Sequence, residues 1–419
     1  MSVSFGQSYH PFAEKPLSDA CWSLSAGPDG RIYSAACVEH TGGHSVTVVR
    51  YDEKRNAPEY LFDVADVCGD PPDSGRATQC KIHYSFAPSP ATDILYCATH
   101  LSGPPKDETH YCPWSAWHDR KRAFMGAMLV AYDTKRDAVL WSELMIPREG
   151  CRCLALDEAR GRLYAITYPR DHFVVYDLKT KTLRDVGRVG SVNCQCIFMD
   201  RIGRAYFTDD MGRVNRYDPE RERLERLPIL YPHAAYQTGW HGVIYDAVGC
   251  GEAVYMLPWM AGSRLVRYWP MEGPHGRMED LGLVNQARDE SFVISLATDH
   301  AGGLVVGGDG RVYFVCSRWK PDIEQPCAWN AAPSDFTAKT AHGDLVAFDP
   351  ATGKMETVLT LQLGPDAVTS SQYVSRGARD HDGNLYFAHI GSRPSGFFRV
   401  TTPWAKAGSS GHLPLRMWG

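Results

Sequence analysis

A short motif recurs along the chain and constrains the fold more than any other feature of the sequence. It consists of a turn containing Asp or Gly, followed by Gly-Arg-x-Tyr or a close variant, as in GPDGRIYSA, SPATDILYCA, DEARGRLYAI, DRIGRAYFT, DGRVYFV and DHDGNLYFA. Apolar stretches that end in Tyr-Asp or a similar pair recur with it, as in VTVVRYDEKRNA, MLVAYDTKRDA, FVVYDLKTKT, RVNRYDPERER, RLVRYWPMEG and DLVAFDPATGK. Such self-similarity is the sequence signature of a repeat architecture.

Each repeat unit spans roughly 35–70 residues and alternates apolar and polar positions between turns, which indicates about four antiparallel strands. Units of this kind form the blades of a β-propeller. We count seven, at approximately 19–65, 78–147, 150–187, 192–229, 238–283, 291–363 and 369–417. We therefore expect an all-β fold, a seven-bladed β-propeller of four-stranded antiparallel blades, as a single domain over 1–419. A pair of β-sandwiches or an open solenoid is the alternative.

Two further expectations concern the edges of this pattern. Residues 413–417, LPLRM, could supply the outer strand of the last blade beside the first and close the ring, because closure removes exposed sheet edges. Insertions at 102–125 and 317–342 interrupt the second and sixth units. Loops of that length inside a compact fold usually carry function.

The composition is that of an ordinary globular protein, with 44% hydrophobic residues, 22% charged residues and a net charge of −5. It predicts neither a nucleic-acid partner nor a membrane partner. The N-terminus lacks a basic patch followed by an apolar run, so we expect a cytoplasmic protein. Thirteen scattered cysteines favour reduced thiols over a disulfide framework.

Two histidines, His83 and His100, bracket a predicted hairpin in CKIHYSFAPSPATDILYCATH. In a blade, the connection into the innermost strand and the connection between the second and third strands lie at the same end, so we expect both histidines at one mouth of the channel. The same rule places further polar and aromatic residues there: His40, Tyr168, His172, Arg188, Trp240, His241, Tyr373, Arg376 and His389. Such a set suits an anionic, hydroxyl-rich ligand. For any one of these residues alone, a satisfied loop side chain is the more frequent explanation. For His83 and His100 together it is the less frequent one, because the fold brings both to a common face.

The segments KIHYSF and YCATH, with the TYP loop of the next unit and an arginine after it, resemble the seven-bladed propeller polysaccharide lyases, namely ulvan lyases and related rhamnosyl-glucuronate lyases. The resemblance implies β-elimination at a 4-linked uronic acid of an acidic oligosaccharide, with no cofactor required. In the family, two histidines, a tyrosine and an arginine neutralise the carboxylate, remove the proton and protonate the leaving oxygen.

Carried over by position, the resemblance assigns Tyr168 as the acid, with a second role as base open to it. It assigns His83 or His100 as the base or as the partner of the substrate carboxylate. The neutralising arginine is Arg184 by its separation from the tyrosine, or Arg188 by its nearness to the mouth, and we favour Arg188. The residues assigned to substrate binding are Trp240, His241, Tyr373, Arg376 and His389.

The long insertion DETHYCPWSAWHDRKRAF departs from the family. Within it, His110, Cys112 and His118 could hold a structural Zn or Ca ion, joined by Cys327 or His342 from the second insertion. By contrast, the cysteines of GCRC and NCQC are expected to be small apolar residues near a crowded axis.

Two other functions stay open. One is a glycoside hydrolase acting on a rhamnose and uronic-acid oligosaccharide, which would need two carboxylates; Asp209 and Asp210 lie on the expected face. The other is a non-catalytic propeller that binds a partner, because fold does not dictate function.

Overall fold

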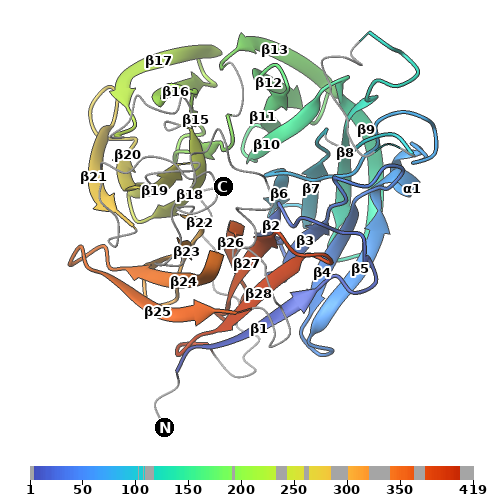
Figure 1. Cartoon of the computed structure of the whole chain (residues 1–419). Coiled ribbons are helices and arrows are strands. Elements are labelled where there is room, and N and C mark those ends of the chain that lie inside the picture. Colours follow the sequence, from blue (N-terminus) through green and yellow to red (C-terminus); the bar gives the residue numbers. More distant parts are fainter. Residues whose placement is uncertain are drawn as a thin grey trace. The chain divides into compact units, whose positions relative to one another are not determined.

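The computed structural model describes residues 4–101, 103–106, 108, 118–190, 194–232, 243–258, 264–284, 301–319, 340–362 and 373–405. These residues form seven four-stranded sheets (Figure 1). The predicted all-β class, a seven-bladed β-propeller, is confirmed. The chain divides into two compact units, one made mainly of residues 10–197 and the other mainly of residues 198–392 with 1–9 and 397–418.

The unit of residues 10–197 contains three sheets, each of four consecutive strands in chain order. The first has β2 (Leu24–Ala26), β3 (Ile32–Ala36), β4 (Thr47–Asp52) and β5 (Ala57–Asp63). The second has β6 (Phe86–Ser89), β7 (Ile94–Ala98), β8 (Gly126–Asp133) and β9 (Ala138–Pro147). The third has β10 (Gly150–Asp157), β11 (Arg162–Tyr168), β12 (His172–Asp177) and β13 (Thr182–Arg188).

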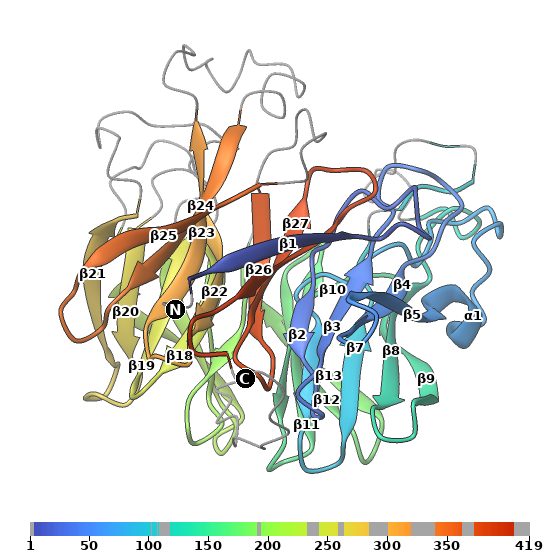
Figure 2. The same cartoon turned by 90° about the horizontal axis from the view of Figure 1, so that it is seen from below.

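A short helix, α1 (Val64–Cys68), follows β5 and contacts both β5 and β9 (Figure 2). The carboxylate of Asp63 caps it by accepting a hydrogen bond from the backbone N–H of Ala65. Gly69, with φ of 64°, ends it in the left-handed conformation that glycine adopts without strain.

The second unit contains four sheets, of which three again follow chain order. Their strands are β14 (Phe198–Met199), β15 (Ala205–Thr208), β16 (Arg213–Asp218) and β17 (Arg223–Leu230); β18 (Ile244–Cys250), β19 (Ala253–Pro258), β20 (Arg264–Trp269) and β21 (Arg277–Leu283); and β22 (Ala301–Val306), β23 (Val312–Trp319), β24 (Thr340–Phe348) and β25 (Met355–Leu361). The last sheet contains β26 (Tyr373–Arg379), β27 (Leu385–Ile390) and β28 (Gly396–Thr401), and its fourth strand comes from the other end of the chain.

That fourth strand is β1 (Gly6–Pro11), which lies beside β28 (Figure 1). The expectation that residues 413–417 supply this strand is wrong, because β1 already occupies the free edge of β28; residues 413–417 lie outside the described part of the chain. The side chain of Tyr9 anchors the pairing, since its ring packs against Phe398 with centroids 5.0 Å apart.

The recurring sequence motif has a direct structural explanation. In five of the six units that carry it, the carboxylate before the motif accepts a hydrogen bond from the hydroxyl of the motif's tyrosine; the unit of SPATDILYCA is the exception. The five pairs are Tyr33–Asp29, Tyr164–Asp157, Tyr206–Asp200, Tyr313–Asp309 and Tyr386–Asp380, with O···O distances of 2.7–2.9 Å. The Arg of the motif often binds the same carboxylate, as Arg204 does to Asp200 at 2.6 Å. The motif recurs in the sequence because its tyrosine and carboxylate form the hydrogen bond that closes these turns.

Replacing Tyr206 by Phe tests this role. Its hydroxyl donates to Asp200 in a buried setting, so we expect the free energy of unfolding to fall by roughly 1.5–3 kcal/mol, the usual range for a hydrogen bond to a charged group. Urea denaturation at pH 7 measures the change. The control is Tyr60→Phe, whose hydroxyl accepts an exposed backbone bond from Glu14 and should cost far less. Equal losses in the two variants would refute the special role of the motif.

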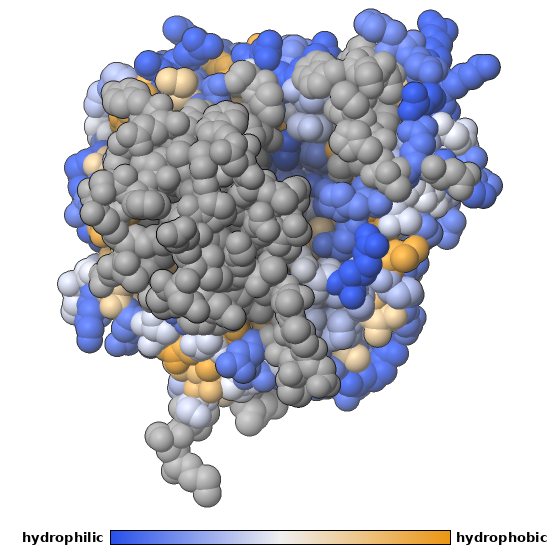
Figure 3. All heavy atoms as spheres, viewed as in Figure 1, coloured by the Kyte–Doolittle hydropathy of each residue, from blue (hydrophilic) through white to orange (hydrophobic). Residues whose placement is uncertain are grey.

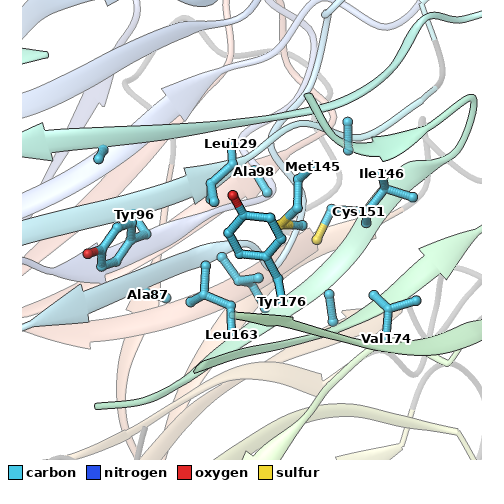
Figure 4. Close-up of a cluster of buried hydrophobic side chains, with 14 residues drawn as sticks. Ala87, Tyr96, Ala98, Leu129, Met145, Ile146, Cys151, Leu163, Val174 and Tyr176 are labelled. Atoms are coloured by element: carbon cyan, nitrogen blue, oxygen red, sulfur yellow. The ribbon is translucent and has the colours of Figure 1, made fainter. Parts of the chain in front are cut away.

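The core of the first unit lies between neighbouring sheets. Figure 4 shows such a cluster, in which Ala98 and Leu129 of the second sheet meet Leu163, Val174 and Tyr176 of the third. Burial of these side chains against one another supplies the main attraction between adjacent blades. It fixes the position of β10 relative to β6 and β7, which carry the candidate site at their ends.

The surface of the described residues can be followed on one face of the molecule. On the face seen in Figure 3, the described residues are mostly hydrophilic with scattered hydrophobic positions. Within the described part of the chain, no helix has the length and hydrophobicity needed to cross a bilayer.

Candidate functional site

The two histidines of the predicted hairpin lie close together. His83 lies just before β6 and His100 just after β7, and the backbone N–H of His100 donates to the carbonyl of Lys81 at 2.7 Å. This bridge brings the two ends of the hairpin side by side, with the imidazole centroids 5.2 Å apart. The side chains are 0% and 2% exposed. The connectivity of the hairpin therefore places the two imidazole rings next to each other in the interior of the protein.

These histidines belong to a longer series of aromatic rings, which we call the aromatic column. Its members are Trp22, His83, His100 and Tyr168. Trp22 stacks on His83 at 4.8 Å and 26°, and His100 stacks on Tyr168 at 4.8 Å and 28°. A cation lies against each end. Lys81 Nζ is 4.1 Å from the Trp22 ring centroid, and the guanidinium carbon of Arg152 is 4.3 Å from that of Tyr168. Such contacts are favourable because the face of an aromatic ring is electronegative.

A β-bulge positions Arg152. In the pairing of β10 with β11, Cys151 lies opposite Thr167 and Cys153 lies opposite Ile166, so Arg152 is an extra residue in the ladder. Bulges are common beside functional sites because they redirect a side chain. The carbonyl of Arg152 accepts bonds from the Tyr84 N–H at 3.2 Å and from His83 Nδ1 at 2.9 Å. The bulge thus connects the third sheet to the segment before β6.

The bond to this carbonyl fixes the tautomer of His83. A carbonyl only accepts, so Nδ1 carries the proton and Nε2 keeps its lone pair when the ring is neutral. Burial lowers the pKa of His83 well below its ordinary value, and the charges of Lys81, Arg152 and His100 lower it further. Burial likewise lowers the pKa of His100, followed by Arg152 and Lys81. Both imidazoles are therefore neutral at pH 7.

The buried ring nitrogens are short of partners. Among the described residues, His83 Nε2 and both ring nitrogens of His100 have no hydrogen-bond partner of ordinary geometry. A weaker interaction with the Leu101 backbone slightly opposes the fall in the pKa of His100. An unpaired buried polar atom typically costs about 1–3 kcal/mol, so each of these three nitrogens has the capacity to bind a further polar group.

The Trp22 end of the column is held by a buried carboxylate. Glu39 accepts a hydrogen bond from Lys81 Nζ at 2.9 Å and another from the indole Nε1–H of Trp22. The side chains of Lys81 and Glu39 are 5% and 10% exposed. The charge of Lys81 is thus compensated within the protein.

At the other end, Tyr168 is half-buried and packs against Ala77, Leu101 and Phe124. Because both histidines are buried, Tyr168 and Trp22 are the members of the column that reach solvent. The partly exposed Tyr168 lies beside the cation Arg152.

The two arginines considered from the sequence lie elsewhere. Arg188 ends β13, the outermost strand of its sheet, where its side chain is exposed and donates to the carbonyl of Gly190 at 2.8 Å. Arg184 lies within the same strand and is also exposed. The guanidinium in contact with the Tyr168 ring belongs to Arg152. The neutralising role expected of Arg188 stays a prediction.

The expected substrate-binding residues belong to the other unit, and some are not described. Arg376 on β26 forms an ion pair with the buried carboxylate of Asp246. His389 is fully buried and its Nδ1 contacts the Tyr9 hydroxyl at 3.1 Å. Trp240 and His241 lie outside the described residues, as does the side chain of Tyr373. Two further residues expected at the mouth, His40 and His172, lie within hydrogen-bond reach of Asp19 and Asp185. Their binding roles stay predictions.

The metal prediction also stays a prediction. His110, Cys112 and Cys327 lie outside the described residues, as does the side chain of His342, and His118 is exposed. The cysteines of GCRC and NCQC are buried and are not in disulfides, which agrees with the expected packing role. Burial raises the pKa of Cys151 to about 12, which keeps this thiol protonated and unreactive.

Sequence reasoning missed four residues of the site: Trp22, Glu39, Lys81 and Arg152. A signal for Arg152 was present, since an arginine between two cysteines at the start of a buried strand is unusual. For Lys81, the signal was its position two residues before His83 in the segment that enters the same blade.

No protein-family model and no curated protein sequence matches this chain. Solved structures do resemble it. The extracellular domain of a B. thetaiotaomicron protein described as a hybrid two-component system is similar at a TM-score of 0.55 and 12% identity, covering 94% of this chain and 39% of that one. This chain thus spans well under half the length of that protein.

Two other solved structures match most of both chains. The β-propeller domain of Cps50 (Swd1) from Myceliophteria thermophila has a TM-score of 0.51 and 11% identity, covering 92% of this chain and 96% of that one. Hydrazine synthase from Kuenenia stuttgartiensis has a TM-score of 0.51 and 12% identity, covering 89% and 93%. At these identities the likeness shows the fold alone. The chain is a seven-bladed β-propeller protein.

Proposed function

We propose that the chain is a lyase that cleaves a 4-linked uronic acid bond in acidic oligosaccharides by β-elimination. The observation that carries the proposal is the contact of Tyr168 with both His100 and Arg152 at the half-buried end of the aromatic column. This contact unites an ionisable phenol, a neutral imidazole with unpaired nitrogens and a cation. The sequence resemblance to propeller lyases supports the same reaction.

The reaction needs three groups. A base removes the proton at C5 of the uronate, and the C–H electron pair forms the C4=C5 double bond. The C4–O bond then breaks with its electrons going to oxygen, which an acid protonates. A cation must neutralise the carboxylate so that negative charge can develop beside it. We assign the neutralising role to Arg152, the acid role to Tyr168 and the base role to His100.

The lowered pKa of His100 is compatible with its role as the base. The shift is caused by burial and by Arg152 and Lys81, in that order. A uronate carboxylate bound to Arg152 would offset the charge of that arginine, and the pKa of His100 would rise on substrate binding. Neutral His100 is also the form that can accept a proton.

A hydrolase is less well supported. Its candidate carboxylate Asp209 lies in the turn between β15 and β16 and accepts bonds from the backbone N–H groups of Met211 at 3.0 Å and Arg213 at 2.9 Å. These bonds give Asp209 a role in closing the turn. A non-catalytic binding protein is favoured by one observation, the burial of His83 and His100, whose side chains are 0% and 2% exposed. The same experiment therefore tests this alternative.

The test is a screen of rhamnosyl-glucuronate, ulvan and oligogalacturonate fragments with the purified full chain. We expect absorbance to rise near ~235 nm as the unsaturated uronate forms. Reducing ends released without this absorbance would establish hydrolysis in its place. Saturable binding without either product would establish a binding protein and overturn the lyase.

A further inference from the structure

Glu149, in the connection from β9 to β10, is a buried acidic residue next to the candidate site. Its side chain is only 3% exposed. One carboxylate oxygen accepts from the Thr167 hydroxyl at 2.5 Å, and the other accepts from Arg170 Nε at 2.6 Å and also from Arg170 Nη2. Its own carbonyl accepts from the Ala127 N–H of β8 at 2.8 Å. Glu149 is therefore fixed to the second sheet and holds two residues of the third.

Those two residues flank Tyr168. Thr167 precedes it at the end of β11, and Arg170 follows it in the loop to β12. The Thr167 hydroxyl gives its hydrogen to Glu149 and accepts from the backbone N–H of His172 at 3.1 Å. One carboxylate thus holds the loop on both sides of Tyr168, directly through Arg170 and through the threonine to His172.

The same segment also approaches the other groups of the site. A Cβ on Gly150 would lie 2.4 Å from the backbone nitrogen of Leu101, so only glycine permits this close packing against the chain beside His100. The next residue, Cys151, donates its N–H to the carbonyl of Thr99 at 2.8 Å. Arg152 then lies against the Tyr168 ring. Residues 149–152 therefore contact the backbone that carries His100, the loop that carries Tyr168 and the ring itself.

From this arrangement we infer that Glu149 is a positioning residue, which holds the Tyr168 loop so that the phenol stays stacked on His100 and beside Arg152. The inference rests on the proposed lyase function for its catalytic consequence. Its structural part, the fixing of the loop through Thr167 and Arg170, does not depend on any substrate.

The first experiment uses Glu149→Gln, which keeps the size of the side chain and removes its charge. Amide hydrogen exchange across residues 167–172 should become at least about tenfold faster, because loops held by few bonds open at low cost. Thr167→Val, which keeps the Glu149–Arg170 pair, should accelerate exchange at His172 in particular. The control Glu225→Gln removes a carboxylate paired with Arg216 at 2.6 Å in the other unit and should leave this loop unchanged. Unaltered loop exchange in both Glu149→Gln and Thr167→Val would overturn the inference.

The second experiment is a double-mutant cycle on the lyase reaction. Glu149→Gln should lower kcat by roughly 10- to 100-fold with little change in KM, since a displacement of about 1 Å at a reacting group costs that much. In a Tyr168→Phe background the same change should have almost no further effect, because Glu149 acts through Tyr168. An equal loss in both backgrounds would show a general structural role and contradict the inference. If the wild-type chain has no lyase activity, the proposed function fails, and the exchange measurement alone decides the role of Glu149.

Discussion

Replacing Arg152 by methionine is expected to lower kcat/KM for uronate elimination by about 10²–10³-fold. That is the usual loss when one group that stabilises developing negative charge is removed. Arg152 is 6% exposed and lies against Tyr168, so its charge acts with little screening by water. Methionine is also unbranched and fills part of the same volume, so the variant removes the charge and keeps much of the side-chain packing.

The matched controls are Arg184→Met and Arg188→Met, which remove the same charge from β13 on the exposed outer edge of the sheet. Both should retain nearly full activity. A loss in Arg188→Met together with full activity in Arg152→Met would restore Arg188 as the neutralising group. A second measurement needs no substrate: removing the Arg152 charge should raise the pKa of His83 and His100, observable by NMR titration of the ring protons.

The protein is expected to lose stability as the pH falls below about 6.5, the pKa of histidine in an unfolded chain. Burial lowers the pKa of His83 and of His100 well below that value in the folded state. Between the folded and the unfolded pKa, the unfolded chain binds more protons than the folded one, so the free energy of unfolding rises with pH and falls with acid. Each histidine contributes a slope of up to about 1.4 kcal/mol per pH unit.

Urea denaturation at several pH values between 7.5 and 5 measures this slope. Carboxylates add to it, so the decisive quantity is the difference between wild type and variant. His100→Gln should make the slope shallower by about 1.4 kcal/mol per pH unit at most, because one titrating group is lost. His275→Gln, at an exposed position, serves as the control. If His100→Gln and the control follow the wild-type slope equally, the buried histidines are not neutral in the folded state.

The blade pattern could be predicted because it is local. The carboxylate of each turn and the tyrosine bound to it lie within a few residues of one another, as Asp200 and Tyr206 do, so the signal is visible in the sequence. The meeting of His83 and His100 could be predicted for a related reason. It follows from the connectivity of one hairpin, which fixes both of its ends at the same edge of the sheet.

The partners of those histidines could not be predicted in the same way. A β-bulge directs Arg152 towards Tyr168. Because side chains alternate between the two faces of a strand, one extra residue reverses the face that the sequence pattern predicts for each residue after it. Trp22 comes from the segment before the first sheet, so its stacking on His83 depends on how two blades pack. The bond from Thr167 to Glu149 likewise joins the Tyr168 loop to the connection between two sheets. None of these contacts leaves a periodic trace in the sequence.

The sequence did not predict the pairing of β1 with β28, because β1 carries no copy of the motif. This pairing also determines when the sheet that contains the two strands can form. During synthesis β1 emerges before β2–β27 and β28 emerges after them, so β1 waits without its partner while the intervening sheets form. Until β28 is synthesised, β1 has open hydrogen-bonding edges, which are the surfaces most prone to pairing with other chains. The sheet that contains β1 and β28 can therefore be completed only after β28 has been synthesised.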